Sequence, residues 1–306
     1  MGVTMTACGF VALIGAPNAG KSTLINKLVG AKVSIVSRKA QTTRGPVRGV
    51  VVEGETQIVF VDTPGLFPPK RRLDRAMAEA AWAAAGDADA LALIVDARAE
   101  IAAGEITDEV GRILDALKPR KGRKALILNK IDLVEAPKLL ALSARLNAAL
   151  PFEETFMICA ESGAGLDRLK RDLGRMMPPG PWLYPADQIA DAPMRALAAE
   201  ITREKIFERL HDELPYQTTV ETESWKDLPD GSARIEQTIY VTREGHKKIV
   251  IGEGGRTLKA IGSAARKEIA AANDSKVHLF LFVKVRENWL DDPERYRAMG
   301  LEFPKK

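Results

Sequence analysis

The sequence predicts an α/β protein in which a doubly wound, mostly parallel sheet domain precedes a smaller α+β domain. Between residues 9 and 177, short apolar runs alternate with helix-like stretches, and after a proline-rich segment at 177–193 the pattern changes. The chain has 306 residues, enough for about two domains of ~100–200 residues each. With 46% hydrophobic and 28% charged residues, the composition is that of an ordinary soluble globular protein.

Five near-continuous runs of Val, Ile, Leu and Ala are the predicted strands of the first domain: residues 9–15, 56–62, 89–97, 124–130 and 154–160. Such runs are typical of parallel strands that are covered on both faces. Amphipathic or Ala-rich stretches between them predict helices at 21–30, 74–88, 108–118 and 136–150. This alternation indicates a doubly wound domain, in which ligands bind beyond the carboxyl ends of the strands.

The second domain follows the proline-rich linker, because proline continues neither a helix nor a central strand. We expect the first domain at 1–178, the linker at 179–193 and the second domain at 194–306. The later pattern predicts a helix at 194–212, strands at 216–225 and 233–242, a helix at 256–272 and a strand at 277–285.

Composition excludes some classes of protein. No apolar run reaches the roughly 18 residues of a membrane span. The N-terminus lacks a basic region, so we expect no signal or transit peptide. Cys8 and Cys159 lack metal-ligand spacing, and two thiols fit a reducing cytosol.

The positive charge is concentrated in one place. Residues 243–268 hold seven Lys or Arg and three Glu, which equals the net charge of +4 of the whole chain. Such a cluster indicates either a polyanion partner or a solvated helix face.

A phosphate-binding loop is predicted where the first strand meets the first helix. GAPNAGKS, Gly15 to Ser22, matches G-x-x-x-x-G-K-[ST] in the required context, which makes a chance Gly-rich turn a poor alternative. Backbone N–H groups can surround phosphate oxygens, Lys21 can reach the β- and γ-phosphates, and Ser22 can bind Mg²⁺. The loop alone does not separate ATP from GTP. The predicted contacts are Gly15, Ala16, Pro17, Asn18, Ala19, Gly20, Lys21, Ser22 and Thr23.

The next strand ends on Asp62, and Thr63, Pro64 and Gly65 follow it. The position of Asp62 fits an acid that holds Mg²⁺ through water, although a turn or helix-cap acid is the alternative. Gly65 would let its N–H approach the γ-phosphate. Leu66 is unexpected, because it places a large apolar side chain in a polar loop.

NKID, which ends a later strand, points to guanine. Asp132 can accept hydrogen bonds from both N1–H and the exocyclic amino group of guanine, a donor pair that adenine lacks. Lys130 would lie along the base and Asn129 would join neighbouring loops. Cys159 and Ala160 could offer a backbone N–H to guanine O6, but a strand end and turn explain them equally well.

GAPNAGKS, TTR, DTPG, NKID and CA together resemble the TRAFAC-class translation-factor-related GTPases. The resemblance extends over essentially the whole chain to the Era family of ribosome-assembly GTPases. It implies a P-loop GTPase domain that binds GTP, GDP and Mg²⁺. In that family Thr43 rather than Thr42 would be the switch threonine, in a mobile loop within residues 32–45. It further implies catalytic roles for Asn18, Lys21, Thr43, Asp62 and Gly65, and metal binding by Ser22, Thr43 and Asp62.

The family usually has Ser–Ala where this chain has Cys159–Ala160. Because the implied contact is through the backbone, we expect guanine binding to survive.

G-x-x-G at Gly252 to Gly255, beside basic residues and before a helix, looks like a type II KH domain. KH loops clamp about four nucleotides of single-stranded RNA. The β-branched stretch KKIVIG predicts a strand, whereas the resemblance implies a short helix, which we follow. Glu253 departs from the family's polar or basic preference, and a small domain with a solvated basic helix is the alternative. The predicted RNA contacts are Lys247, Lys248, Ile251, Gly252, Glu253, Gly254, Gly255, Arg256, Lys259 and Arg266.

The resemblance implies a cytoplasmic monomer that binds 16S rRNA near its 3′ end and assists maturation of the 30S ribosomal subunit. Weak peripheral contact with the cytoplasmic face of the inner membrane remains open, as does a membrane-associated signalling switch. A rival from another class is an RNA-binding adaptor that holds guanine nucleotide without hydrolysing it.

Leu66 occupies the position at which Ras-like GTPases carry the glutamine that orients water. Era-like relatives share an apolar residue there, which implies slow basal turnover. The resemblance adds a possible K⁺ ion at Asn18, which can supply positive charge during hydrolysis.

Overall fold

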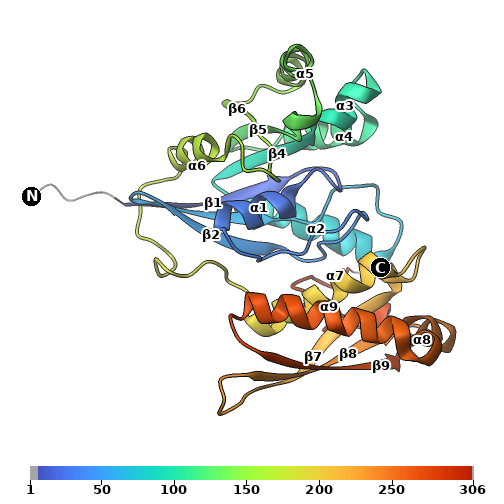
Figure 1. Cartoon of the computed structure of the whole chain (residues 1–306). Coiled ribbons are helices and arrows are strands. Elements are labelled where there is room, and N and C mark those ends of the chain that lie inside the picture. Colours follow the sequence, from blue (N-terminus) through green and yellow to red (C-terminus); the bar gives the residue numbers. More distant parts are fainter. Residues whose placement is uncertain (1–5, 305–306) are drawn as a thin grey trace, which may run out of the picture. The chain divides into compact units, whose positions relative to one another are not determined.

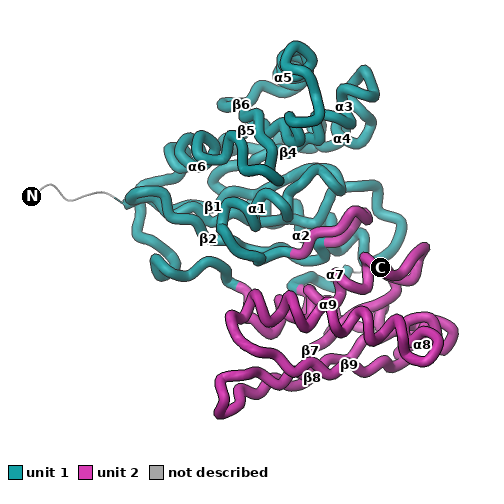
Figure 2. The backbone as a smooth tube through the Cα atoms, in the orientation of Figure 1, with its two compact units in different colours: residues 1–34, 43–191, 300–306 teal, residues 35–42, 192–299 magenta. Residues whose placement is uncertain are grey.

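The computed structural model describes residues 6–304. Residues 1–5 and 305–306 lie outside the described part, and so does the start of the N-terminal region in which we expect no signal or transit peptide. The chain divides into two compact units (Figure 2). Unit 1 comprises residues 1–34, 43–191 and 300–306, and unit 2 comprises residues 35–42 and 192–299.

A six-stranded sheet in the order β2-β3-β1-β4-β5-β6 forms the centre of unit 1 (Figure 1). Every neighbouring pair is parallel except β2 and β3, which form an antiparallel hairpin. The doubly wound, mostly parallel fold is therefore confirmed, whereas β2 was not predicted. The strands are β1 Ala7–Ile14, β2 Val47–Glu53, β3 Thr56–Asp62, β4 Ala90–Asp96, β5 Arg123–Asn129 and β6 Glu154–Met157.

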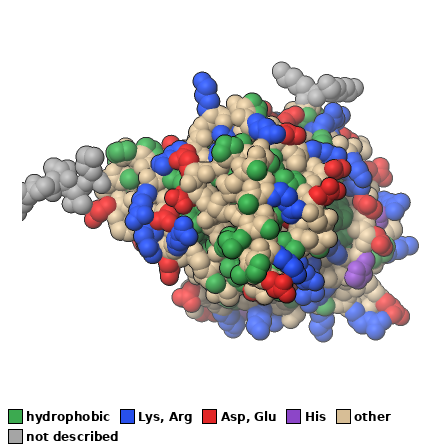
Figure 3. Space-filling model, turned by 90° about the horizontal axis from the view of Figure 1, so that it is seen from above, with side chains coloured by type: hydrophobic (Ala, Val, Ile, Leu, Met, Phe, Trp, Pro, Cys, Tyr) green, Lys and Arg blue, Asp and Glu red, His purple; other side chains and the backbone are tan. Residues whose placement is uncertain are grey.

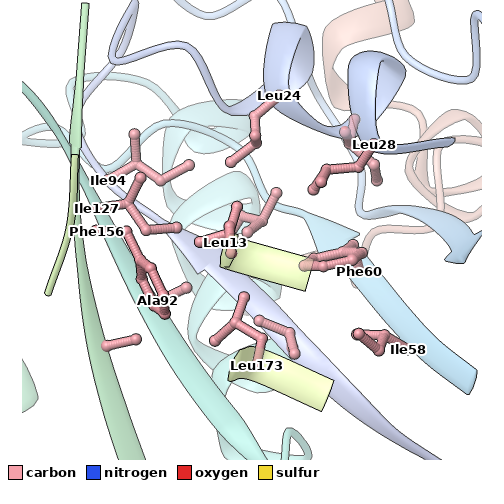
Figure 4. Close-up of a cluster of buried hydrophobic side chains, with 14 of the residues drawn as sticks. Leu13, Leu24, Leu28, Ile58, Phe60, Ala92, Ile94, Ile127, Phe156 and Leu173 are labelled. Carbon is pink, nitrogen blue, oxygen red and sulfur yellow. The ribbon is translucent and has the colours of Figure 1, made fainter. Parts of the chain in front are cut away.

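Helices cover both faces of this sheet. Leu24 of α1 and Leu173 of α6 pack in the hydrophobic cluster on one face, which Figure 4 shows. Ala81 of α2, Ile113 of α4 and Leu142 of α5 pack in the cluster on the other face. The helices are α1 Lys21–Val29, α2 Arg72–Gly86, α3 Ala97–Ala103, α4 Asp108–Leu117, α5 Ala136–Ala149 and α6 Leu166–Gly174.

Unit 2 is the smaller α+β fold. Its sheet has the order β7-β8-β9, with β7 antiparallel and β9 parallel to β8. Residues 247–251 of KKIVIG lie in helix α8, as the family resemblance implied and against their β-branched content, and Gly252 caps the helix. The elements are α7 Met194–Arg209, β7 Thr218–Asp227, β8 Ala233–Val241, α8 Glu244–Ile251, α9 Arg256–Ala272, β9 Val277–Val285 and α10 Pro293–Ala298.

The proline-rich segment runs along unit 1 and is fastened to it. The Gln57 side chain donates to Tyr184 O at 2.8 Å, and Val50 N donates to Ile189 O at 3.0 Å. Arg48 and Asp191 form an ion pair of 2.8 Å. The segment is therefore tied down over most of its length.

Among the described residues, no helix is long and apolar enough to cross a membrane. On the face of the molecule drawn in Figure 3, basic and acidic side chains are interspersed.

Candidate functional site

The phosphate loop joins β1 to α1. Gly20 has φ 102° and caps α1, a conformation that favours glycine. The Lys21 ammonium donates to the carbonyl oxygens of Gly15 at 2.9 Å and Ala16 at 2.8 Å, which curls the loop around its own lysine. Burial lowers the pKa of Lys21 to about 8, although the charge of Asp62 opposes the shift. A phosphate group in the loop would supply the negative charge that this ammonium requires.

Asp62 gathers three hydroxyl groups around one carboxylate oxygen. Its Oδ2 lies 2.7 Å from Ser22 Oγ, 2.7 Å from Ser34 Oγ and 3.4 Å from Thr43 Oγ1. Ser22 Oγ and Thr43 Oγ1 are 3.0 Å apart. Burial raises the pKa of Asp62, against the opposing effects of Lys21 and the hydroxyls.

This cluster fits a magnesium ion. Asp62 Oδ1 is buried and has no hydrogen-bond partner, and carboxylate and hydroxyl oxygens are the hard ligands that Mg²⁺ prefers. Ser22, Thr43 and Asp62 were all predicted here, whereas Ser34 was not. Its local sequence, AKVSIV, matches no motif, so nothing in the chain marks it out.

The geometry favours Thr43 over Thr42 as the switch threonine. Thr43 Oγ1 faces the Asp62 cluster, while Thr42 Oγ1 donates to Lys39 O at 2.9 Å. The Thr42 carbonyl accepts a hydrogen bond from Arg203 at 2.5 Å. The two threonines therefore point to different partners.

The D-x-x-G loop packs directly on the phosphate loop. Leu66 N donates to Gly15 O at 3.1 Å. A Cβ on Gly65 would lie 2.9 Å from Pro17 Cα, closer than real Cβ atoms approach, so only glycine fits. The Leu66 side chain is 5% exposed and packs in the core cluster that contains Ala12 and Ile14.

The residues predicted to bind guanine line one small cavity of about 100 Å³. Asn129 connects three segments there: its Nδ2 donates to Ala19 O at 2.9 Å, and its Oδ1 accepts from Ala160 N at 3.0 Å. Lys130 donates to Asn18 O at 3.0 Å and pairs with Asp96 at 2.5 Å. The cavity is lined by Gly20, Thr23, Asn129, Lys130, Asp132, Leu133, Cys159, Ala160 and Glu161.

Leu133, Glu161 and Asp96 were missed by sequence reasoning. Each lies within a few residues of a predicted motif or at the end of a predicted strand. The predicted strand ends therefore indicate the region in which these residues lie, but no motif distinguishes their side chains from those of their neighbours.

Residues 35–42, which connect Ser34 to Thr43, pack with α7 in unit 2. Val36 N donates to Glu204 Oε1 at 2.6 Å. The Lys39 ammonium donates to Phe207 O at 2.6 Å and also to Leu210 O, at the C-terminal end of α7. The two residues that flank this segment, Ser34 and Thr43, contact Asp62 in unit 1, whereas the segment itself bonds to α7.

The G-x-x-G loop between α8 and α9 is built from left-handed glycines. Gly252, Gly254 and Gly255 have φ values of 73°, 59° and 77°, which explains why glycine is required. Glu253 forms an ion pair with Arg256, so the unusual acid neutralises one of the predicted RNA-binding cations. Lys248, Arg256, Lys259 and Arg266 are exposed, and Lys247 and Ile251 are partly exposed.

Comparisons with known proteins match both units. The family model described as "50S ribosome-binding GTPase" matches residues 10–130, and the KH domain model matches residues 213–290. GTPase Era of Afipia carboxidovorans is 63% identical over 300 residues, covering 98% of this chain and 96% of that protein. GTPase Era of Brucella suis is 59% identical over 301 residues, covering 98% and 95%.

Two solved structures are similar over nearly the whole chain. One is Era in complex with MgGDPNP and nucleotides 1506–1542 of 16S ribosomal RNA, and the other is an Aquifex aeolicus Era variant bound to GDP and AlF₄⁻. Each has a TM-score of 0.89 and 37% identity, and covers 96% of this chain and 99% of its own. By its full-length relatives, both units and the residues of its nucleotide cavity, the chain belongs to the GTPase Era family.

Proposed function

We propose that this chain hydrolyses GTP to GDP and phosphate at a Mg²⁺-dependent site in unit 1. It binds 16S rRNA near its 3′ end through unit 2 and thereby assists 30S maturation. The observation that carries the enzymatic part is Asn129, because it joins the phosphate loop at Ala19 to the guanine cavity at Ala160. One ligand that fills both regions is a guanine nucleotide.

The residues divide the work on that nucleotide. Backbone N–H groups of the phosphate loop and Lys21 bind the phosphates, and Asp132 reads guanine. Ser22, Thr43 and Asp62 would hold Mg²⁺, which neutralises charge on the phosphate oxygens when bound. Gly65 supplies a close backbone N–H, and Leu66 keeps its loop against the phosphate loop.

The test of the nucleotide assignment is Asp132→Asn. Xanthine carries a carbonyl where guanine carries its exocyclic amino group, so an amide in place of the carboxylate should favour xanthosine triphosphate. We expect the variant to lose GTP binding by at least about 100-fold and to gain xanthosine triphosphate hydrolysis. Unchanged GTP turnover would contradict the assignment.

Lys21→Ala separates an enzyme from an adaptor, since only an enzyme has turnover to lose.

The assignment of 16S rRNA as the RNA partner rests on the full-length relatives. It does not rest on the "50S" description, because that family model matches residues 10–130 alone. Support comes from the left-handed G-x-x-G loop, its exposed cations and the rRNA in the similar Era complex. Crosslinking in cells, followed by sequencing of the bound RNA, should enrich the 3′ end of 16S rRNA. An even spread over messenger RNAs would contradict the ribosomal assignment.

We further propose that the protein works in the cytoplasm as a monomer, with unit 2, which contains residues 194–299, as its RNA-binding domain. A weak peripheral contact with the inner membrane is the alternative. Cell fractionation at low and high salt distinguishes the two, because a surface contact would be released as salt screens it. Sedimentation of the purified chain tests the monomer.

A further inference from the structure

The β7–β8–β9 sheet has one face that its long helices leave uncovered. Helices α7, α8 and α9 lie on one side of the sheet (Figure 1). Leu281 and Val283 of β9 pack in that core, with Val250 of α8 and Ile261 of α9. The alternate residues of β9 point the other way, because side chains in a strand alternate between faces.

Those outward positions form a row of basic and aromatic side chains without an acid. Phe280 and Phe282 stand at its centre and are 41% and 50% exposed. Lys276, Lys284 and Arg286 are exposed, and His278 is partly exposed. The β9 row, in chain order, is Lys276, His278, Phe280, Phe282, Lys284 and Arg286.

The acids of the neighbouring strands bond to side chains outside the row: Glu236 and Glu221 to arginines, and Glu223 to the Tyr240 hydroxyl at 2.9 Å. Within the row, Arg286 pairs with Asp292 at 3.4 Å. Arg234 of β8 pairs with Glu236 at 2.8 Å, and its guanidinium lies 4.4 Å from the centre of the Phe280 ring. Arg295 of α10 pairs with Glu221 of β7, which is in register with Thr238 of β8 and, beyond it, Phe282 of β9. Helix α10 therefore covers the β7 side of the face, while Phe280, beneath Arg234, and Phe282 keep 41% and 50% of their surface exposed.

We propose that the β9 row is a second RNA-contact surface, which stacks bases of the single strand that flanks the segment held by the G-x-x-G loop. Alternate residues along a strand are about 6.6 Å apart, a spacing at which each ring can receive one splayed base. Aromatic rings on a sheet bind unstacked bases, and flanking cations follow the phosphates. The two phenylalanines are the stacking platform, and Lys284 meets the backbone.

The position of β9 connects this row to the G-x-x-G loop. β9 is an edge strand, and α8 and α9, which flank residues 252–255, both pack against it. A strand of RNA that leaves the loop can therefore cross this edge and continue over the outer face. The inference rests on the proposed RNA-binding function and extends the length of RNA that unit 2 recognises.

The experiment measures the affinity of the full-length chain for two RNA oligonucleotides from the 3′ end of 16S rRNA. One has about five nucleotides, enough for the four that a KH loop clamps, and the other has about twelve. Replacing both rings, with Phe280→Ala and Phe282→Ala together, should weaken binding of the longer RNA by at least about tenfold. Binding of the shorter RNA should stay unchanged.

Two matched variants show whether the ring itself matters. Phe280→Tyr with Phe282→Tyr should keep the affinity for the longer RNA, whereas Phe280→Leu with Phe282→Leu should lose it. Unchanged binding of the longer RNA by the alanine variant overturns the inference, as does an equal loss for both oligonucleotides. Full affinity of the leucine variant also overturns it, since this indicates an apolar face for a protein partner. If the unaltered chain binds neither RNA, the proposed function itself fails.

Discussion

Leu66 is the residue at which the site departs most clearly from Ras-like GTPases. The glutamine that they carry orients the attacking water, but the Leu66 side chain is buried in the core of unit 1. Its backbone N–H binds Gly15 O at 3.1 Å. The residue therefore fastens one loop to the other, and the water has to be oriented by another group.

Restoring the glutamine should not restore the Ras-like mechanism. In Leu66→Gln, a polar amide would replace a buried apolar side chain, which we expect to cost about 1–3 kcal/mol of stability without raising turnover. Thermal unfolding and phosphate release measure the two effects. Leu66→Met, which conserves volume, is the control and should cost less than about 1.5 kcal/mol. Faster hydrolysis by the glutamine variant would show that the side chain can reach the site.

We propose that Asn18 holds a K⁺ ion, which would supply positive charge during hydrolysis. We expect hydrolysis to be on the order of tenfold faster in K⁺ than in Na⁺, and Asn18→Ala to remove the difference. Asn18 has φ 62°, a conformation in which alanine is strained. Asn18→Gly is therefore the necessary control, because it removes the side chain without that strain. Equal rates of the unaltered chain in both salts would refute the K⁺ proposal.

Among single residues, the sequence predicted those that belong to motifs and missed those that do not. The phosphate loop and NKID were readable because nucleotide chemistry requires those residue types at fixed spacing. Ser34 joins Asp62 at 2.7 Å only because the chain returns to the site after α1. A contact of that kind depends on the path of the loop, which no local pattern records.

Among the elements, α8 shows how tertiary context decides between two local preferences. Its β-branched residues favour a strand, but Val250 is fully buried in the core of unit 2 and the chain forms a helix. The β2–β3 hairpin was missed because the expected pattern was parallel. Strong apolar runs identified the five parallel strands, whose burial on both faces gives them a distinctive composition.

The start of α8 contains a buried histidine whose protonation should destabilise unit 2. His246 Nε2 accepts from Arg243 Nε at 2.7 Å, so Nδ1 carries the proton and donates to Thr242 Oγ1 at 3.0 Å. Burial, and then the charge of Arg243, lower the pKa of His246 below its ordinary 6.5. The neutral form is thus favoured in the folded state. This contribution to the stability of the folded state is present above pH 6.5 and is lost as the pH falls through the lowered pKa of His246.

We therefore expect the unaltered chain to lose more thermal stability than His246→Gln between about pH 7.5 and pH 5.5. The measurement is the unfolding midpoint of both proteins across this range. Glutamine can keep a hydrogen bond but cannot titrate, so it isolates the proton. Parallel curves for the two proteins would mean that His246 does not carry the pH dependence.

For the whole molecule, the division into units does not follow the order of the chain. Residues 35–42 pack with unit 2, although both flanking residues belong to unit 1 and contact Asp62. The last residues, from 300 on, return to unit 1, where Arg72 lies over the Phe303 ring. The expected boundaries treated each domain as one continuous stretch, because sequence patterns carry no record of such exchanges.

This arrangement supports a coupling between nucleotide and RNA. We propose that the state of Thr43 at the nucleotide site and the hold of α7 on residues 35–42 bias each other. RNA affinity should then differ between GDP and a non-hydrolysable GTP analogue, by about 5–150-fold for coupling of ordinary strength. Equal affinities in the two states would remove the basis for coupling.

Lys39 is the residue through which this coupling can be tested. Lys39→Ala removes the hydrogen bonds to Phe207 O and Leu210 O and should bring the two RNA affinities close together. Lys138→Ala, which removes an exposed lysine on α5, is the matched control and should leave their ratio unchanged. Linkage adds a stricter requirement. If the GTP analogue, relative to GDP, changes the affinity for RNA by some factor, RNA must change the affinity for the analogue, relative to GDP, by the same factor. A Lys39→Ala chain that keeps both factors would show that the segment is held by unit 2 without transmitting the nucleotide state.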